Sequence, residues 1–273
     1  MLPTMKIGNL EVTRLIVGSN PFTGKSHLDA ATDADMKNYF TEEQAFAMLR
    51  RCEEAGINAV QSRGSMPVMG LIGRYRAEGG NLLWLAQSGK NLTTFEEELD
   101  EMMKYDPAAV CIHGELADNL YMAGQLDKLG GLMDLIRRKN VPVGICAHFP
   151  EVLSYAEEKA LGADYYMASV YNLMQPDRSH DVNPEGERFE DSDLPIMYQV
   201  IRALSAPTFA LKILGAGRKC ETQEQVRKTF IDAFASMKPG DGVLVGMFDK
   251  YIDQPRLNAA YTEEAIRLAE EKR

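Results

Sequence analysis

The chain contains four histidines, and each of them follows a short apolar run of the kind that forms a buried parallel strand. His27 comes after RLIVG, His113 after AAVCI, His148 after VPVGICA and His180 after DYYMASVYN. Imidazole is a general acid or base near neutral pH and a common metal ligand. In an α/β barrel the residues after the strands meet at one rim, where catalytic groups gather, so the four rings indicate a site.

His113 and His148 form the best-supported pair of the four. Each stands two residues after a cysteine of its own strand, Cys111 or Cys146, so alternation places all four side chains on matching faces. Neighbouring strands lie about 4.8 Å apart, and two imidazoles at that separation can act as acid and base. They can also share a divalent metal ion such as Zn, Mn, Fe, Co or Ni. Further metal ligands would come from two loop histidines, if their loops fold over the rim, or from carboxylates: His27, His180, Glu115 and Asp249.

A different interpretation needs no metal and no catalysis. His113 and His148 would then be hydrogen-bonded residues at strand ends, and the loop histidines His27 and His180 would be exposed. No HxH or HExxH spacing is present to favour the metal site over this alternative.

A lysine and an arginine follow the seventh apolar run, in TFALKILGAGR. Lys212 lies at an interior or rim position, where an ammonium group is unfavourable unless it has a partner or a function. It could bind a substrate anion, neutralise an enolate or form a Schiff base. The structural alternative is an ion pair with a rim carboxylate such as Asp249. The next turn, Gly215 to Arg218, offers amide groups and a guanidinium to a phosphate or carboxylate.

Neutral and cationic hydrogen-bond donors stand at other strand ends. Gln61 and Arg63 follow the second apolar run, Gln87 the third and Asn172 the sixth. Such a ring suits a small polyhydroxylated or carbonyl-bearing substrate better than an apolar one. We therefore predict that these four side chains, together with Arg218, bind the substrate.

The elements that must position these residues are short apolar runs that alternate with longer amphipathic segments, which is typical of βα units around a parallel sheet. Helix starts are visible at Thr41 and Thr222, and Gly56 closes the first helix. Eight runs favour a closed (β/α)8 (TIM) barrel over an open doubly wound sheet, whose GxGxxG turn is missing after the first run. The eight predicted strands are Arg14 to Gly18, Ile57 to Val60, Leu82 to Ala86, Ala109 to Ile112, Pro142 to Ala147, Asp164 to Tyr171, Thr208 to Leu214 and Gly242 to Gly246.

The chain is predicted to be one domain, residues 1–273, because a barrel of this length is a single unit and no linker divides it. The opening MKIGNLEV, with Gly8-Asn9 between apolar pairs, predicts a short β-hairpin before the first barrel strand. Long loops are predicted at about 19–40 and 172–191. Each contains a histidine, as a substrate lid or binding loop would.

Composition limits the partners of the protein. The chain has 30 Lys and Arg against 40 Asp and Glu, a formal net charge of -10, and no basic run, so we expect no nucleic acid partner. No signal-peptide pattern and no apolar stretch of about 18 residues is present, so we expect no membrane partner. The four cysteines lack CxxC spacing, which favours reduced thiols and a cytoplasmic location. A small-molecule substrate is the remaining expected partner, and no feature indicates an oligomeric state.

The hairpin followed by TRLIVGSNPF resembles the start of the aldo-keto reductases, in which a similar hairpin leads into a strand ending in a Gly-rich turn. The resemblance covers nearly the whole barrel and implies a (β/α)8 fold with NADPH as cofactor. Segments similar to the second, fourth, sixth and eighth strands of that family are GINAV, VCIH, VYNL and VLVGM.

The catalytic tetrad of that family is incomplete in this chain. Those reductases use Asp, Tyr, Lys and His near the ends of the second to fourth strands, and the Tyr gives a proton to the substrate carbonyl. The corresponding positions here are Gln61, no tyrosine in SRGSMPVMG, Gln87 and His113. A neutral glutamine cannot lower the pKa of a tyrosine as a lysine does, and without the phenol there is no acid.

The leading hypothesis is an enzyme related in fold to the aldo-keto reductases that acts on a small sugar-like or oxo substrate by metal-assisted or acid/base chemistry, as an isomerase, epimerase or lyase. In it, His113, His148 and Lys212 are the catalytic residues. A second hypothesis is an atypical NAD(P)-dependent oxidoreductase, and a third is a barrel that binds a ligand without catalysis.

Overall fold

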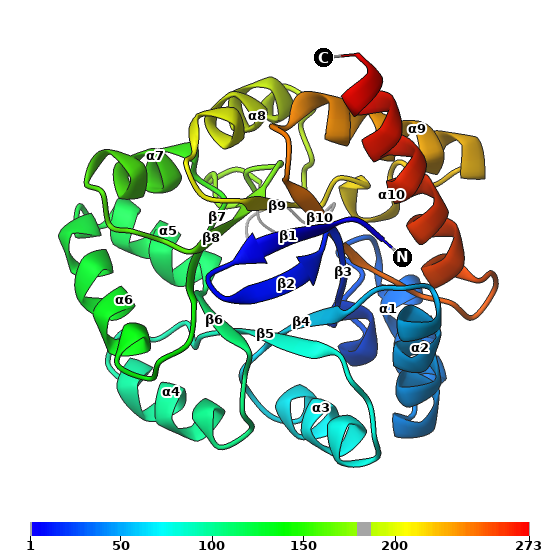
Figure 1. The fold of residues 1–273 in the computed structure, drawn as a ribbon, viewed down its shortest axis with the longest axis horizontal. Coiled ribbons are helices and arrows are strands. Elements are labelled where there is room, and N and C mark those ends of the chain that lie inside the picture. Colours follow the sequence, from blue (N-terminus) through cyan, green and yellow to red (C-terminus); the bar gives the residue numbers. More distant parts are fainter. Residues whose placement is uncertain (1, 179–186, 273) are drawn as a thin grey trace.

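The computed structural model describes residues 2–178 and 187–272, and its central element is a closed barrel of eight parallel strands (Figure 1). Neighbouring strands follow the order of the chain, and the last pairs with the first, Val243 opposite Leu15. The predicted (β/α)8 barrel is therefore confirmed. Its strands are β3 (Leu15–Gly18), β4 (Ala59–Arg63), β5 (Leu83–Gln87), β6 (Ala109–Ile112), β7 (Val143–Ala147), β8 (Tyr165–Ser169), β9 (Thr208–Leu211) and β10 (Gly242–Gly246).

Helices connect the strands and cover the outside of the barrel (Figure 1). Two helix starts predicted from the sequence are confirmed, because the hydroxyl groups of Thr41 and Thr222 accept hydrogen bonds from the first turns of α2 and α9. Gly56, after α2, has a left-handed φ of 84°, as a helix-terminating glycine does. The helices after the strands are α2 (Glu42–Glu54), α3 (Val68–Ala77), α4 (Phe95–Met103), α5 (Gly114–Met122), α6 (Leu129–Arg137), α7 (Pro150–Glu158), α8 (Asp193–Ala203), α9 (Gln223–Ser236) and α10 (Gln254–Glu271).

Several predicted boundaries differ from the structure. The second strand, predicted from Ile57 to Val60, is Ala59–Arg63, and the first, third and fifth strands begin one residue later than predicted. The sixth strand is shorter than 164–171, and the seventh, predicted to continue to Leu214, ends at Leu211 because Lys212 has a left-handed φ of 65°. The loop predicted at 19–40 contains a 3-10 turn, Asn20–Thr23, and helix α1 (Ala30–Tyr39), which begins where Asp29 accepts a hydrogen bond from Thr32. Helix α1 buries no side chain, so it lacks the apolar periodicity from which a helix is predicted.

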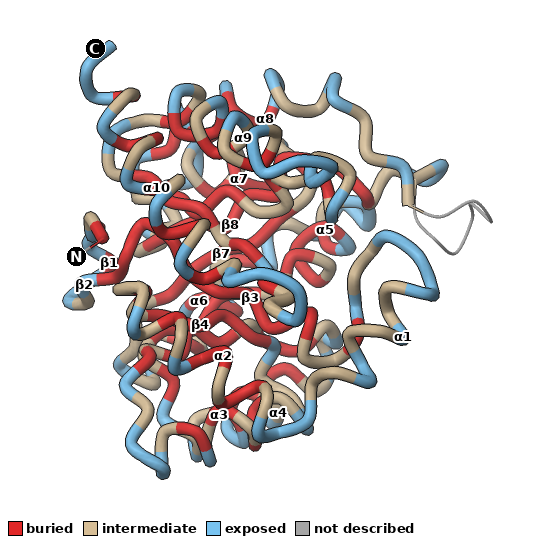
Figure 2. Tube along the Cα trace, turned by 90° about the vertical axis from the view of Figure 1, so that its right-hand side faces the viewer, coloured by how far each residue is buried: buried red, intermediate tan, exposed pale blue. Residues whose placement is uncertain are grey.

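Alternation along the strands sorts the apolar side chains into two cores. One set faces the helices, and the other, the inner cluster, fills the barrel; the buried layers appear in Figure 2. In the inner cluster, Gly144 leaves space for the ring of Tyr165, since a Cβ on Gly144 would lie 2.5 Å from the Tyr165 Cζ atom. The buried members of the inner cluster are Met5, Ile7, Val12, Ile16, Ala59, Leu85, Ala109, Cys111, Cys146, Tyr165, Met167 and Phe209.

The N-terminal hairpin closes one end of the barrel. Strands β1 (Thr4–Ile7) and β2 (Leu10–Thr13) pair as predicted and place Met5, Ile7 and Val12 in the inner cluster. The hairpin turn lies at the N-terminal ends of the strands, since a Cβ on Gly8 would contact Pro142, the residue before β7, at 2.9 Å. Figure 2 shows the hairpin and helix α1 at opposite ends of the molecule, so the long loops lie at the carboxyl ends of the strands. Within the described ranges, no helix has the length and apolar character needed to cross a membrane.

Candidate functional site

A buried carboxylate orients His148, the histidine that follows strand β7. The side chain of Asp118, on helix α5, is fully buried, and its Oδ2 atom lies 2.7 Å from the Nδ1 atom of His148. The same carboxylate accepts backbone hydrogen bonds from His148 and Phe149, each at 3.1 Å. Because Asp118 acts as an acceptor, Nδ1 of His148 carries the proton, and Nε2 is left as a free acceptor.

His113 has the opposite proton arrangement. It is the N-cap residue of α5, and its Nδ1 atom accepts a hydrogen bond from the backbone N–H of Glu115 at 3.1 Å. Its own backbone N–H donates to Ser88. Since Nδ1 is an acceptor, the proton of the neutral ring is on Nε2, which is therefore a donor. Burial, followed by the charges of Lys90 and Arg63, lowers the pKa of His113 to about 3, so the ring is neutral at pH 7.

The chain next to His113 lies close to the ring of His148. Gly114, the residue after His113, lies beside this ring: a Cβ on Gly114 would come within 3.4 Å of His148 Cε1 and 3.1 Å of Cys146 Sγ. A larger residue at this position would move one of these groups. A close approach of this kind explains why residue 114 is a glycine.

Three cationic side chains, those of Arg63, Lys90 and Lys212, lie with the histidines at the carboxyl ends of the strands. We call this region the mouth, and its residues are Gln61, Arg63, Gln87, Lys90, His113, His148 and Lys212. Lys90 forms an ion pair with Glu115. Within the described part of the chain, neither the guanidinium of Arg63 nor the ammonium of Lys212 has a hydrogen-bond or ion-pair partner. The mouth is thus positively charged in a protein whose net charge is -10.

Lys212 is placed in the mouth by an interruption of its strand. Leu211 packs against the inner cluster, and the left-handed backbone of Lys212 follows directly. The ammonium interacts electrostatically with Glu187 and with Cys146 of the inner cluster, and burial lowers the pKa of Lys212. The ion pair with Asp249 considered from the sequence is not formed, because the buried Asp249 carboxylate is bound by Arg51.

Gln61 and Gln87, at the ends of β4 and β5, form a neutral pair. The Nε2 atom of Gln61 donates to Oε1 of Gln87 at 3.2 Å. These are the positions where the reductase tetrad has Asp and Lys, so a pair of amides replaces two charged groups. Neither amide can supply or tune a proton at neutral pH, which leaves hydrogen bonding to a ligand as their available role.

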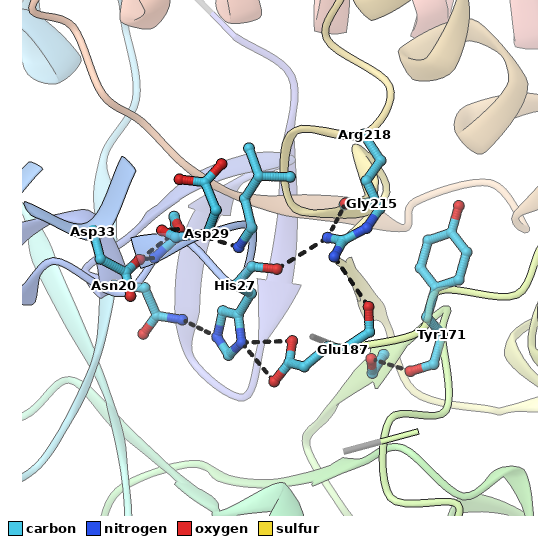
Figure 3. Close-up of polar contacts among 11 residues, drawn as sticks. Asn20, His27, Asp29, Asp33, Tyr171, Glu187, Gly215 and Arg218 are labelled. Atoms are coloured by element: carbon cyan, nitrogen blue, oxygen red, sulfur yellow. Dashed lines mark hydrogen bonds and ion pairs between the residues drawn. The ribbon is translucent and has the colours of Figure 1, made fainter. Parts of the chain in front are cut away.

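A second cluster joins the two long loops beside the mouth (Figure 3). We call it the clasp, and its residues are Asn20, His27, Glu187 and Arg218. The Nδ1 atom of His27 lies 2.9 Å from a carboxylate oxygen of Glu187, and Asn20 lies 3.2 Å from the Nε2 atom of His27. Arg218 donates to the backbone carbonyls of both His27 and Glu187, at 2.9 and 3.0 Å, and stacks 4.3 Å from the ring centroid of Phe189. Repulsion by Lys212 lowers the pKa of His27, so this ring is also neutral at pH 7.

The structure separates the predicted site residues into groups. His113, His148, Lys212, Gln61, Arg63 and Gln87 meet in the mouth, whereas His27 and Arg218 form the clasp. Asn172 is buried, and its Oδ1 atom accepts a hydrogen bond from the backbone of Met174, which fixes the loop after β8. The predicted metal ligand His180 lies outside the described residues.

Three residues of the site were missed from the sequence: Asp118, Lys90 and Glu187. Asp118 carries a usable signal, because it is an acidic residue on the apolar face of GELADNLYM and a buried carboxylate requires partners. Lys90 and Glu187 lie in loops, where no periodicity predicts their neighbours.

The donor set of the mouth does not fit a metal bound jointly by the two histidines. A metal on Nε2 of His113 would require the proton on Nδ1, which already accepts the Glu115 amide hydrogen. Of the carboxylates considered as further ligands, Glu115 is paired with Lys90 and Asp249 with Arg51. No group of three or more His, Cys, Asp or Glu side chains in residues 2–178 and 187–272 is arranged to hold a metal ion.

Comparison with known proteins places the architecture. No protein-family model matches the chain, and no curated protein matches it. Among solved structures, an aldo-keto reductase from Bacillus halodurans is similar with a TM-score of 0.59 at 10% identity, over 98% of this chain and 96% of that one. The chain therefore shares the (β/α)8 barrel fold of this reductase.

Other (β/α)8 enzymes are similar to nearly the same degree. A truncated 3-deoxy-D-arabino-heptulosonate 7-phosphate synthase from Thermotoga maritima matches with a TM-score of 0.54 and 14% identity, covering 99% of this chain and 93% of that one. A 3-hexulose-6-phosphate synthase matches with 0.53 and 15%, covering 92% and 99%. Identity this low relates the folds, and the chemistry must be argued from the mouth itself.

Proposed function

We propose that this protein is an enzyme that moves a proton at the carbon next to a carbonyl group in a small anionic, sugar-like substrate, as an isomerase, epimerase or lyase. The observation that carries the proposal is the opposite arrangement of hydrogen bonds on two imidazoles at the ends of neighbouring strands. His148 presents a free Nε2 acceptor, and His113 presents an Nε2–H donor. A base and a hydrogen-bond donor side by side are the two groups that enolisation requires.

In this reaction His148 removes the proton on carbon. Asp118 holds the ring by its Nδ1–H and stabilises the imidazolium that forms, while the backbone amides bound to the same carboxylate fix its position. His113 donates a hydrogen bond to the carbonyl oxygen as negative charge develops there. Its low pKa suits a neutral donor, because the ring does not become cationic at physiological pH.

The charge of the mouth supports an anionic substrate. Arg63 and Lys212 have no described partner, and both lie close enough to His113 to lower its pKa. A carboxylate or phosphate on the substrate would pair with Arg63, and hydroxyl groups would bind the amides of Gln61 and Gln87. Two of the structurally similar enzymes are named for sugar phosphates, which supports this class by analogy of fold alone.

Carbonyl reduction with NADPH finds less support. The fold is shared with aldo-keto reductases, but the mouth has amides at the Gln61 and Gln87 positions and lacks the expected tyrosine in the segment after β4. A neutral His113 with a pKa of about 3 is a poor proton donor to an alkoxide. The residues therefore favour proton transfer over hydride transfer.

The test is exchange of substrate hydrogen with solvent. Ketose phosphates and 2-oxo acids are incubated with the protein in heavy water, and loss of the proton signal next to the carbonyl is followed by NMR. We expect exchange with at least one compound, and His148→Gln to slow it by about 10²–10⁴-fold at an unchanged melting temperature. Asp118→Asn, which keeps the shape but alters the acceptor, should give a smaller loss.

Three results would overturn the proposal. Exchange that is unaffected in His148→Gln would remove the base. A stoichiometric divalent metal in the purified protein that is lost in His148→Gln would restore the metal hypothesis. A ligand that raises the melting temperature without any exchange would favour a binding barrel without catalysis.

A further inference from the structure

We propose that Lys212 is a nucleophile that forms a Schiff base with the carbonyl carbon of the substrate. The inference rests on the proposed function and changes one step of it. The iminium nitrogen, in place of the carbonyl oxygen, receives the electron pair when His148 removes the proton, and His113 binds that oxygen before it leaves as water. The inference also narrows the substrate to an aldehyde or ketone, since esters and amides do not form this intermediate.

The first argument is the position of the amine. Strand alternation would direct residue 212 toward the helices, because Leu211 packs against the inner cluster. The left-handed backbone of Lys212 breaks that alternation, and Cys146 of the inner cluster is among the groups that act electrostatically on the ammonium. A left-handed lysine costs about 1 kcal/mol, and backbone outliers of this kind concentrate at functional sites.

The second argument is the absence of a described partner. Lys90, the other lysine of the mouth, is neutralised by Glu115. The carboxylate that acts most strongly on the charge of Lys212 is Glu187. The described contact of this carboxylate is with His27, and it forms no described ion pair with Lys212. Burial lowers the pKa of Lys212, which increases the fraction of neutral amine that can attack a carbonyl.

The third argument is the set of groups around the amine. Lys212 and His148 each act electrostatically on His27 and on His113. The amine, the proposed base and the proposed donor are therefore close enough to influence one another. Lys212 forms no ion pair with a described carboxylate, whereas a structural lysine would.

The reaction balances without another reagent. The Nζ lone pair attacks the carbonyl carbon, the carbonyl oxygen takes up a proton, and the resulting carbinolamine loses water to form an iminium ion. His148 then takes the proton from the adjacent carbon, and the electron pair of that C–H bond moves toward the iminium nitrogen to form an enamine. Return of a proton to carbon and attack by water release the product and the amine.

Borohydride trapping tests the inference. The protein is treated with sodium borohydride in the presence of pyruvate or dihydroxyacetone phosphate, and peptides are mapped by mass spectrometry. We expect one major adduct on the Lys212 peptide, heavier by the mass of the ligand less one oxygen. Lys212→Arg and Lys212→Met should abolish this adduct, whereas Lys139→Arg, at a lysine that is paired with Asp100 outside the mouth, should retain it.

The outcomes separate this inference from the proposed function. His148-dependent exchange without a Lys212 adduct would overturn the Schiff base and leave the proton transfer standing. A Lys212 adduct without His148-dependent exchange would overturn the proposed proton transfer and leave the Schiff base standing. Adducts spread over exposed lysines at the same level in Lys212→Met, or no adduct with either compound, would overturn the inference.

Stability gives a second readout that does not depend on turnover. Since Lys212 is half-buried and its ammonium has no described partner, Lys212→Met should raise the melting temperature by about 1–3 °C. A lysine that serves a structural ion pair would instead lower the melting temperature when replaced.

Discussion

The two ends of the barrel interior are built from the same eight strands and have opposite character. At the hairpin end, apolar side chains such as Ile7 and Ile16 are fully buried and packed. At the mouth, His113 and His148 stand two residues after Cys111 and Cys146, on the same faces of their strands. The change from apolar to polar within one strand repeat shows that stability and chemistry are assigned to different ends of one scaffold.

The largest effect on stability should come from the hairpin end. Ile7 is fully buried, so Ile7→Ala should lower the free energy of unfolding by about 2–4 kcal/mol through lost burial and a cavity. Chemical denaturation measures this loss, and exposed Lys6→Ala on the same strand is the matched control with less than about 0.5 kcal/mol. Hydrogen exchange into the substrate, per folded molecule, should be unchanged. A tenfold loss of exchange in Ile7→Ala would mean that the two ends are coupled and that the comparison fails.

The next effect should appear in the acid stability of the mouth. An unfolded histidine binds a proton near pH 6.5, whereas folded His113 does so only near pH 3. Between these values the unfolded state binds more protons, so His113 makes the free energy of unfolding fall as pH falls, by up to about 1.4 kcal/mol per pH unit. His113→Gln should flatten this dependence between pH 6.5 and 4. Denaturation curves at several pH values measure it, with Ile7→Ala as a control that shifts the curve without changing its slope; parallel curves for His113→Gln would contradict the assignment.

The smallest effect should come from the clasp. Glu187→Gln keeps the size of the side chain but replaces the carboxylate that accepts from His27, so we expect a loss of less than about 1 kcal/mol in stability. Amide hydrogen exchange of residues 20–28 should become faster, because this loop loses one of its ties. Asp177→Asn, in an exposed ion pair with Arg188, is the control and should change neither. If residues 20–28 exchanged their amide hydrogens at the same rate in Glu187→Gln and Asp177→Asn, Arg218 would be sufficient to hold the two loops together.

Most of the fold could be predicted because the barrel strands are apolar, short and regularly spaced. The inner phase of Cys111, His113, Cys146 and His148 followed from alternation alone, and the contact between Gly114 and His148 agrees with it. The end of β9 could not be predicted in this way, since the apolar run continues past Lys212 and only its backbone angle ends the strand.

The polar connections of the site were less accessible. Asp118 and His148 are 30 residues apart, and their contact depends on how α5 packs against β7. The proton positions of the two imidazoles depend on single hydrogen bonds, to Asp118 and from Glu115, that no spacing encodes. From the sequence, His113 and His148 are equivalent candidates for a metal site. With these hydrogen bonds known, we propose different roles for them, a donor and a base.

The hairpin also sets an order for assembly. Its apolar side chains Met5, Ile7 and Val12 come early in the chain, but the surface that they cover includes Phe209 and is complete only when β10 pairs with β3. This pairing joins residues more than 200 positions apart, as in Val243 opposite Leu15, so the hairpin must wait for nearly the whole chain. A chain interrupted before β10 would therefore expose two unpaired strand edges together with an uncovered apolar hairpin, and quality control would recognise it as unfinished.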